Sequence, residues 1–160
     1  MQVDEKRYQQ FRLDQTLPAF TQCSLDNNFG TGKILDTPQD TKNGDGKPAK
    51  DAFDGDSEGY LNRYLRWETA DEQVVDEPKA WGLSVFLIKS CPQEQCSVDI
   101  TPRRCQKFKA AADGKFKWTN TDAEGKEIQT GTAQADKNGL VTMEKVTISK
   151  GGNRIRLVPE

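Results

Sequence analysis

The side chains best suited to hold a metal lie in an acidic, glycine-bearing stretch between positions 36 and 59. Ca²⁺ takes about six to eight oxygen ligands, which closely spaced carboxylates and amides supply, and a glycine permits the sharp turn of such loops. Gly46 stands at such a turn, although Thr41 and Ala52 occupy the first and last positions of the full calcium-loop pattern. A solvated loop without metal is the alternative, and no other cofactor is expected. The candidate ligands are Asp40, Asn43, Asp45, Asp51, Asp54 and Asp56.

Aromatic side chains form a second candidate site, because flat rings can stack on the apolar faces of sugars. Trp67 and Trp81 alternate with apolar neighbours, so we expect both of them in the core. Tyr60, Tyr64 and Trp118 are the better candidates for exposure. These three predict a glycan-binding platform. The alternative is that they too pack inside the protein.

A basic run of four side chains comprises Arg103, Arg104, Lys107 and Lys109. Strand alternation would place three of them on one face together with Cys105, and Arg104 on the other. Such a stripe could contact phosphate, an acidic partner or the protein's own acidic stretch. The alternative is a solvated edge strand, whose lysines discourage pairing with a second chain.

Most catalytic machinery is excluded by composition. The chain has no histidine, which removes Ser-His-Asp triads, Cys-His pairs and His-ligated zinc, and it has no nucleophile elbow, phosphate loop or dinucleotide fingerprint. A pair of carboxylates for glycoside hydrolysis is the one chemistry that the composition allows. The candidate carboxylates for this reaction are Glu68, Asp71, Glu72, Asp76 and Glu77. They surround a turn over 70–78, where carboxylates are normally solvated, so we predict that the chain is not an enzyme.

The cysteines indicate an oxidising compartment. Their number is even, and no pair has the Cys-x2-Cys spacing of zinc or thioredoxin-like sites. We favour Cys91–Cys96 across the mouth of a hairpin and Cys23–Cys105 between the N-terminal segment and the body, and other pairings stay open. The first seven residues lack the apolar core of a signal peptide. If the protein is exported, we interpret Met1 as a start residue added to a mature or excised fragment. Four reduced thiols in a cytosolic protein are the alternative.

Composition and charge limit the classes of partner that the protein could bind. Of 160 residues, 34% are hydrophobic and 30% are charged, and the formal net charge is −2. That balance does not suit a general nucleic-acid binder. The longest apolar run is 85–88, far short of the roughly 18 residues of a membrane helix. We therefore expect no nucleic-acid partner and no membrane insertion, and the oligomeric state stays open.

The apolar pattern after residue 59 has a period of two, which predicts strands. We expect an all-β antiparallel sandwich of about seven to nine strands in one domain. Residues 1–35 would pack on it as an N-terminal segment, 36–59 would form the acidic loop, and 60–160 the sandwich body. Strands are expected over 60–69, 81–89, 97–102, 115–119, 126–133, 140–148 and 154–158, with turns at 122–125, 136–139 and 150–153.

Two turn motifs give the C-terminal part a likeness to a known family. One is Gly-Thr-x-x-x-Asp-x-x-Gly over 131–139, and the other is Lys-Gly-x-Asn over 150–153. With these motifs, residues 97–158 resemble the immunoglobulin-like and fibronectin-III-like modules of bacterial secreted and surface proteins. The run Ile100–Arg104 looks like segments in accessory domains of large secreted bacterial hydrolases. The cysteines and the acidic insert depart from the family pattern.

The resemblance implies a non-catalytic module that acts as a spacer, stabiliser, adhesion domain or glycan contact. We therefore expect a secreted, periplasmic or cell-surface protein whose partner is another protein domain or a polysaccharide. A carbohydrate-binding module is the first alternative, and a self-assembling subunit of a surface layer or filament is the second.

Overall fold

The computed structural model describes residues 14–27 and 59–160. The chain divides into two compact units, one formed by Met1–Gln22 with Tyr64–Glu160 and the other by Cys23–Arg63. The six candidate calcium ligands lie outside the described residues, namely Asp40, Asn43, Asp45, Asp51, Asp54 and Asp56.

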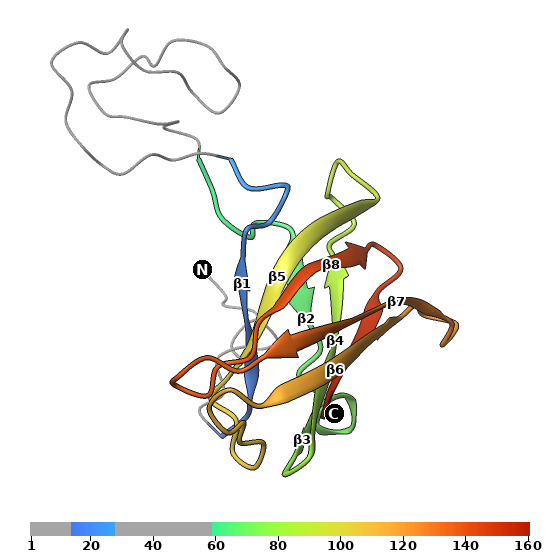
Figure 1. Ribbon diagram of the computed structural model, residues 1–160. Coiled ribbons are helices and arrows are strands. Elements are labelled where there is room, and N and C mark those ends of the chain that lie inside the picture. Colours follow the sequence, from blue (N-terminus) through green and yellow to red (C-terminus); the bar gives the residue numbers. More distant parts are fainter. Residues whose placement is uncertain (1–13, 28–58) are drawn as a thin grey trace, which may run out of the picture. The chain divides into compact units, whose positions relative to one another are not determined.

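The larger sheet of the first unit has six antiparallel strands in the order β2-β4-β9-β6-β7, and β3 pairs with β4 on the same edge as β2 (Figure 1). Because β4 and β9 lie in the middle, both edges of each are hydrogen-bonded to neighbouring strands. The strands are β2 Leu65–Trp67, β3 Val75–Glu77, β4 Ala80–Leu87, β6 Lys115–Thr121, β7 Glu127–Gln134 and β9 Asn153–Pro159.

The smaller sheet has three antiparallel strands in the order β1-β5-β8. They are β1 Leu17–Thr21, β5 Gln95–Arg103 and β8 Met143–Ser149. The chain thus changes sheet between β4 and β5, and the hairpin expected around residues 91–96 is wrong. Segment 88–94 crosses from one sheet to the other instead. The expected all-β, antiparallel architecture is confirmed: the one helical element among the described residues is a 3₁₀ turn, η3 Asp71–Gln73.

The core lies between the inward faces of the two sheets. Alternate residues of β5, β6 and β9 are buried, as the period of two predicts. Trp81 is completely buried, as expected, whereas Trp67 is only partly covered and packs edge-on against Phe20 with ring centroids 6.0 Å apart. The fully buried aliphatic side chains include Leu83, Val85, Val98, Ile100, Val146, Ile148, Ile155 and Leu157.

Side-chain amides join the two sheets where β7 approaches β8. Gln129 of β7 accepts from the backbone N–H of Thr147 at 2.9 Å and donates to the carbonyl of Lys145 at 2.9 Å. Asn120 of β6 donates to the carbonyl of Thr147 at 2.8 Å. These side-chain amides therefore bond the backbone of β8 as a neighbouring strand would, and they satisfy the N–H and C=O groups of the half-buried Thr147.

The N-terminal strand is fixed by polar contacts around Thr16, which is 2% exposed. Its Oγ1 donates to the carbonyl of Arg103 at 2.8 Å and accepts from the indole Nε1 of Trp81 at 2.9 Å. The neighbouring Gln15 donates to the carbonyl of Thr69 and to Oδ1 of Asp71, each at 3.0 Å. These bonds link β1 to both sheets.

The three expected turns are present. At 122–125 and 136–139 the fourth residue donates its N–H to the carbonyl of the first, at 3.1 and 2.9 Å. Gly125 and Gly139 have φ of +83° and +73°, the left-handed region that glycine enters without steric cost. At 150–153, Gly152 has φ +89° and donates to the carbonyl of Ser149.

Two expected strands are wrong or shortened. The strand over 60–69 is reduced to Leu65–Trp67, and Leu61 is 56% exposed. The basic run after residue 103 is a loop rather than an edge strand, because the Asp76 carboxylate accepts the N–H groups of three successive residues. These are Gln106 at 2.6 Å, Lys107 at 3.2 Å and Phe108 at 2.7 Å. An alternating strand would point successive N–H groups in opposite directions.

The second unit is described at residues 23–27 and 59–63. Asn27 and Tyr60 form an antiparallel bridge with hydrogen bonds of 3.0 and 3.1 Å. Asp26 accepts from the backbone N–H of Asn62 at 2.6 Å, and the guanidinium of Arg63 lies 5.1 Å from the centre of the Tyr60 ring. Among the described residues, no helix is long and apolar enough to span a membrane.

Candidate functional site: a groove on the outer face of the larger sheet

The outward face of the larger sheet is polar. Since Trp81, Leu83 and Val85 of β4 point into the core, the residues between them point out, and Ser84 and Phe86 are partly exposed there. In β9 the same alternation turns Arg154 and Arg156 outward between buried neighbours. Ser84 lies opposite Arg154, which in turn lies opposite Thr121 of β6.

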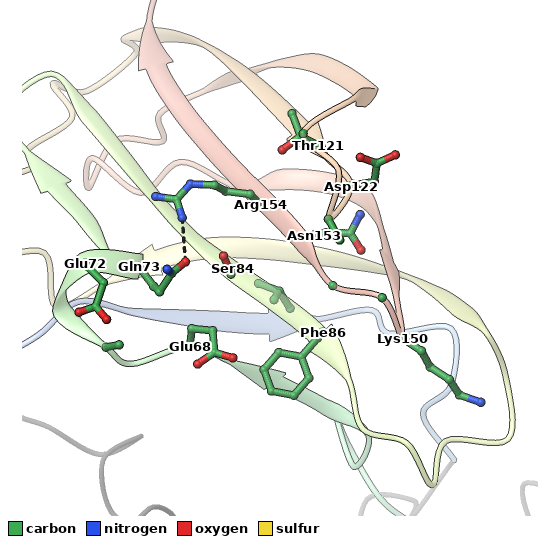
Figure 2. Close-up of a pocket in the computed structure, with 16 residues that line it drawn as sticks. Glu68, Glu72, Gln73, Ser84, Phe86, Thr121, Asp122, Lys150, Asn153 and Arg154 are labelled. Carbon is green, nitrogen blue, oxygen red and sulfur yellow. Dashed lines mark hydrogen bonds between the residues drawn. The ribbon is translucent and has the colours of Figure 1, made fainter.

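A groove of about 660 Å³ runs over this face (Figure 2). Its floor is formed by β4 and the start of β9. One wall is the segment 68–73, which follows β2 and includes η3, and the other is formed by the turns at 121–125 and 150–152. Gly151 and Gly152 contribute no side chain to that second wall, so the groove stays open there.

Arg154 is held across the floor. Its Nη1 donates to Oε1 of Gln73 at 3.1 Å, the bond that is drawn dashed in Figure 2. The 3₁₀ turn places Gln73 by a hydrogen bond from its own N–H to the carbonyl of Ala70 at 2.8 Å. The segment 68–73 is also anchored at its start, because the N–H of Glu68 donates to the carbonyl of Ser84 at 2.9 Å.

The charged groups of the groove divide into those used by the fold and those left available. Lys150 forms a 2.8 Å ion pair with Glu94 and points away from Arg154 in Figure 2. Asp122 accepts the N–H groups of Glu124 in its own turn, at 3.1 Å, and of Lys126 just after it, at 2.9 Å. The exposed carboxylates of Glu68 and Glu72 have no hydrogen bond or ion pair within the described part of the chain. They can therefore bind a ligand without breaking an internal contact.

Trp118 is not available for the aromatic platform expected from the sequence. Trp118 is 4% exposed, so its expected exposure is wrong. Its ring lies over Gly131 of β7, where a Cβ atom would come within 2.6 Å of it. Tyr60 and Tyr64 are partly exposed and belong to different units. Among the described residues that line the groove, the aromatic side chain is instead Phe86.

The acids considered for catalysis have separate roles. Asp71 accepts from Gln15, and Asp76 holds the loop after β5. Only Glu68 and Glu72 face the groove. Among the described residues, no three His, Cys, Asp or Glu side chains are close enough to hold a metal ion together.

The basic run borders a smaller cavity of about 330 Å³. Arg103, Arg104 and Lys109 line it together with Cys105, whose Sγ lies 3.3 Å from Oγ1 of Thr16. Burial raises the pKa of the Cys105 thiol, and the hydrogen bond with Thr16 opposes that shift. No disulfide joins the cysteines in the structure, where Cys23, Cys91 and Cys96 are buried, and both expected pairs, Cys91–Cys96 and Cys23–Cys105, stay predictions.

Sequence reasoning missed the groove because its side chains come from segments far apart in the chain. Two local signals point to parts of it. Phe86 is an aromatic residue on the second face of a strand whose first face is fully apolar, and Arg154 and Arg156 alternate with buried aliphatics. Comparison of the chain with known protein families, with curated proteins and with solved structures found no match.

Proposed function

We propose that this chain is a non-catalytic module of a larger secreted or surface protein, and that it binds a carbohydrate ligand in the groove on the outer face of its larger sheet. The observation that carries the proposal is the set of available groups around Phe86. Glu68 and Glu72 have carboxylates that no other described residue bonds, and Gln73 and Arg154 add an amide and a guanidinium. Carboxylates and amides form hydrogen bonds with sugar hydroxyls, and an aromatic ring packs against the C–H face of a sugar.

We also propose that the two sheets form an immunoglobulin-like sandwich. That fold places strands A, B and E in one sheet and C, F and G in the other, with an added C′ next to C in the variable type. The order β1-β5-β8 matches A-B-E, and β7-β6-β9 matches C′-C-F. The place of strand G, antiparallel to F, is taken by β4, which precedes B in the chain. The resemblance over residues 97–158 covers B to F in this assignment.

Export and disulfide formation belong to the same proposal. Cys91 and Cys96 are both buried, and Cys105 is partly exposed. We propose the pairs Cys91–Cys96 and Cys23–Cys105 in protein made in an oxidising compartment. Intact mass before and after reduction measures the number of bonds, and peptide mapping under non-reducing conditions identifies the pairs. Four thiols that all react with an alkylating reagent, in protein exported to the periplasm, would contradict this part.

Self-assembly is a second candidate function, favoured by β7. This strand forms an end of the larger sheet, carries one charged residue, and exposes Ile128 by 46%. Edge strands that are not blunted by charges can pair with a second chain. Light scattering after size-exclusion chromatography separates the two functions. Oligomers that dissociate in Ile128→Lys favour assembly, and a monomer at all concentrations excludes it.

The binding proposal is tested with a glycan array and with two groove variants. Phe86→Ala removes the ring and Glu68→Gln removes one available charge, and neither side chain makes a polar contact with another residue that the structure describes. We expect binding to the glycan that the wild type selects to fall about tenfold or more in each. Gln93→Ala, an exposed position outside the groove, is the control. A wild type that binds no glycan, or variants that bind as well as the wild type, would refute the proposal.

A further inference from the structure

The three central strands of the larger sheet have charges of one sign. Strands β4, β9 and β6 contain four charged side chains, and all four are basic. Each alternates with buried core residues, so all four lie on the outward face. This surface, called the basic face below, consists of Lys115, Lys117, Arg154 and Arg156.

Within residues 14–27 and 59–160, no acidic side chain forms a hydrogen bond or ion pair with these four cations. The ion pair of Lys150 with Glu94 lies outside the basic face. Arg154 donates to the neutral amide of Gln73, so its charge is not compensated. Unpaired cations that share one face attract an anionic ligand and raise its local concentration.

Hydroxyl groups lie beside the two arginines of the basic face. Arg154 and Arg156 are two residues apart on one strand, which separates their backbones by about 6.7 Å. Thr121 lies opposite the first and Thr119 opposite the second on the neighbouring strand, about 4.8 Å away. A guanidinium can bind a sulfate or carboxylate group with two parallel hydrogen bonds, and a threonine hydroxyl can add a third.

On the β4 side of Arg156 the surface of the sheet is recessed, because the residue opposite Arg156 is Gly82, which has no side chain. A Cβ atom at Gly82 would stand 2.5 Å from the carbonyl oxygen of Ile155, so a larger residue cannot be accommodated there without a shift of β9. A depression of about 170 Å³ results, with both guanidinium-bearing residues and the two threonines on its border. It adjoins the groove, since Arg154 lines both.

We propose that the basic face binds the sulfate or carboxylate groups of an acidic polysaccharide whose sugar rings occupy the adjoining groove. This inference rests on the proposed function and names its ligand class. The groove favours such a ligand over a nucleic acid, because Glu68 and Glu72 would repel a continuous row of phosphates but can accept hydrogen bonds from sugar hydroxyls. A polysaccharide whose anionic groups are separated by neutral sugar surface matches both the basic face and the groove.

The test uses dextran, dextran sulfate and carboxymethyl dextran, which share one neutral backbone and differ in their charged groups. Affinity electrophoresis of the full chain in each polymer measures retardation. We expect both charged polymers to retard the protein and dextran to retard it less. The Arg154→Gln/Arg156→Gln variant should lose about tenfold or more of this affinity. Arg103→Gln/Arg104→Gln removes the same charge from the loop after β5 and should bind as the wild type does.

The outcomes are distinct. Equal retardation by all three polymers overturns the inference and leaves the proposed carbohydrate function standing. No retardation by either charged polymer overturns the inference, and the array with the Phe86→Ala variant then decides the proposed function separately. Loss of binding in the Arg103/Arg104 variant alone would place the anion site on the loop and overturn the assignment. Equal competition by single-stranded DNA would overturn the polysaccharide class. Thermal unfolding of both double variants checks that they fold.

Discussion

Asn153 donates from its Nδ2 to Oδ1 of Asn120 at 3.0 Å, and the two amides are 2% and 0% exposed. Each of the two side-chain amides also forms a hydrogen bond with the backbone. Oδ1 of Asn153 accepts from the backbone N–H of Ser149 at 2.7 Å, and Nδ2 of Asn120 donates to the carbonyl of Thr147. Strands β9, β6 and β8 are thus tied together inside the protein. The strand that carries Arg154 is held in place directly beneath the groove.

Replacing Asn120 by Ala should destabilise the fold strongly. The change leaves the amide of Asn153 and the carbonyl of Thr147 without their partner in a buried place, and it opens a small cavity. We expect the free energy of unfolding to fall by about 2–4 kcal/mol. Urea denaturation measures the change. Gln93→Ala removes an exposed amide from the loop before β5 and should change the free energy by less than about 0.5 kcal/mol; equal values for the two variants would contradict a structural role for the amide chain.

A second prediction concerns the packing of Trp118 over Gly131. A methyl group at position 131 would stand 2.6 Å from Cζ2 of the indole, so Gly131→Ala must displace either the ring or β7. We expect a loss of about 1–3 kcal/mol, the usual cost of overpacking, and a change in tryptophan fluorescence.

Gly151→Ala is the matched control for that variant. The nearest atom to its new methyl group would be Oγ of Ser149 at 3.8 Å, an ordinary contact distance. Its free energy of unfolding should stay within about 0.5 kcal/mol of the wild type. A loss of equal size in both variants would mean that glycine flexibility, and not the tryptophan contact, sets the cost.

The period-two pattern and the turns could be predicted because both are local. Alternation along β5 and β9 follows from which face of the strand each residue occupies, and the Asp136–Gly139 turn depends on a carboxylate and a glycine within four residues. The division into two sheets could not be predicted, because it depends on which strands pair across long stretches of chain. The error at Trp118 has a related cause. Lys115 and Lys117 indicate a solvated face, but they alternate with the tryptophan, which turns inward.

The loop after β5 shows why the candidate basic stripe failed. Its sequence contains alternating cations, which would suit an edge strand, and nothing within it indicates the partner that bends it. That partner is Asp76, which lies 30 residues before Gln106. The groove is nonlocal in the same way, since Glu68, Phe86 and Arg154 come from different strands or loops. A single sequence predicts which face of a strand a side chain occupies more readily than it predicts which residues that side chain contacts.

Asp76→Ala should release the loop after β5. Three backbone N–H groups lose a charged acceptor, which should lower the free energy of unfolding by about 2–4 kcal/mol and speed amide hydrogen exchange at residues 106–108. Asp76→Asn keeps one acceptor oxygen and should lie between that variant and the wild type. Glu77→Gln neutralises the exposed acid next to it and should leave exchange in the loop unchanged. Unaltered exchange in Asp76→Ala would contradict the anchoring role.

The turn at 136–139 makes stability depend on pH. Hydrogen bonds from the backbone N–H groups of Leu140 and Asn138, at 2.9 and 2.8 Å, lower the pKa of the exposed Asp136 carboxyl. The unfolded chain then binds a proton at higher pH than the folded chain does. The contribution of this carboxylate is therefore complete above the ordinary Asp pKa of about 3.9 and is lost as the pH falls through the lower folded value.

Asp136→Asn keeps an acceptor oxygen at the turn but does not titrate. Its free energy of unfolding should fall less than that of the wild type between about pH 5 and pH 2, as measured by urea denaturation at each pH. Glu144→Gln removes one exposed charge from β8 and should follow the wild-type curve. If Asp136→Asn and the wild type lose stability in parallel over this range, the turn carboxylate does not contribute to acid sensitivity, and other acids of the chain must account for it.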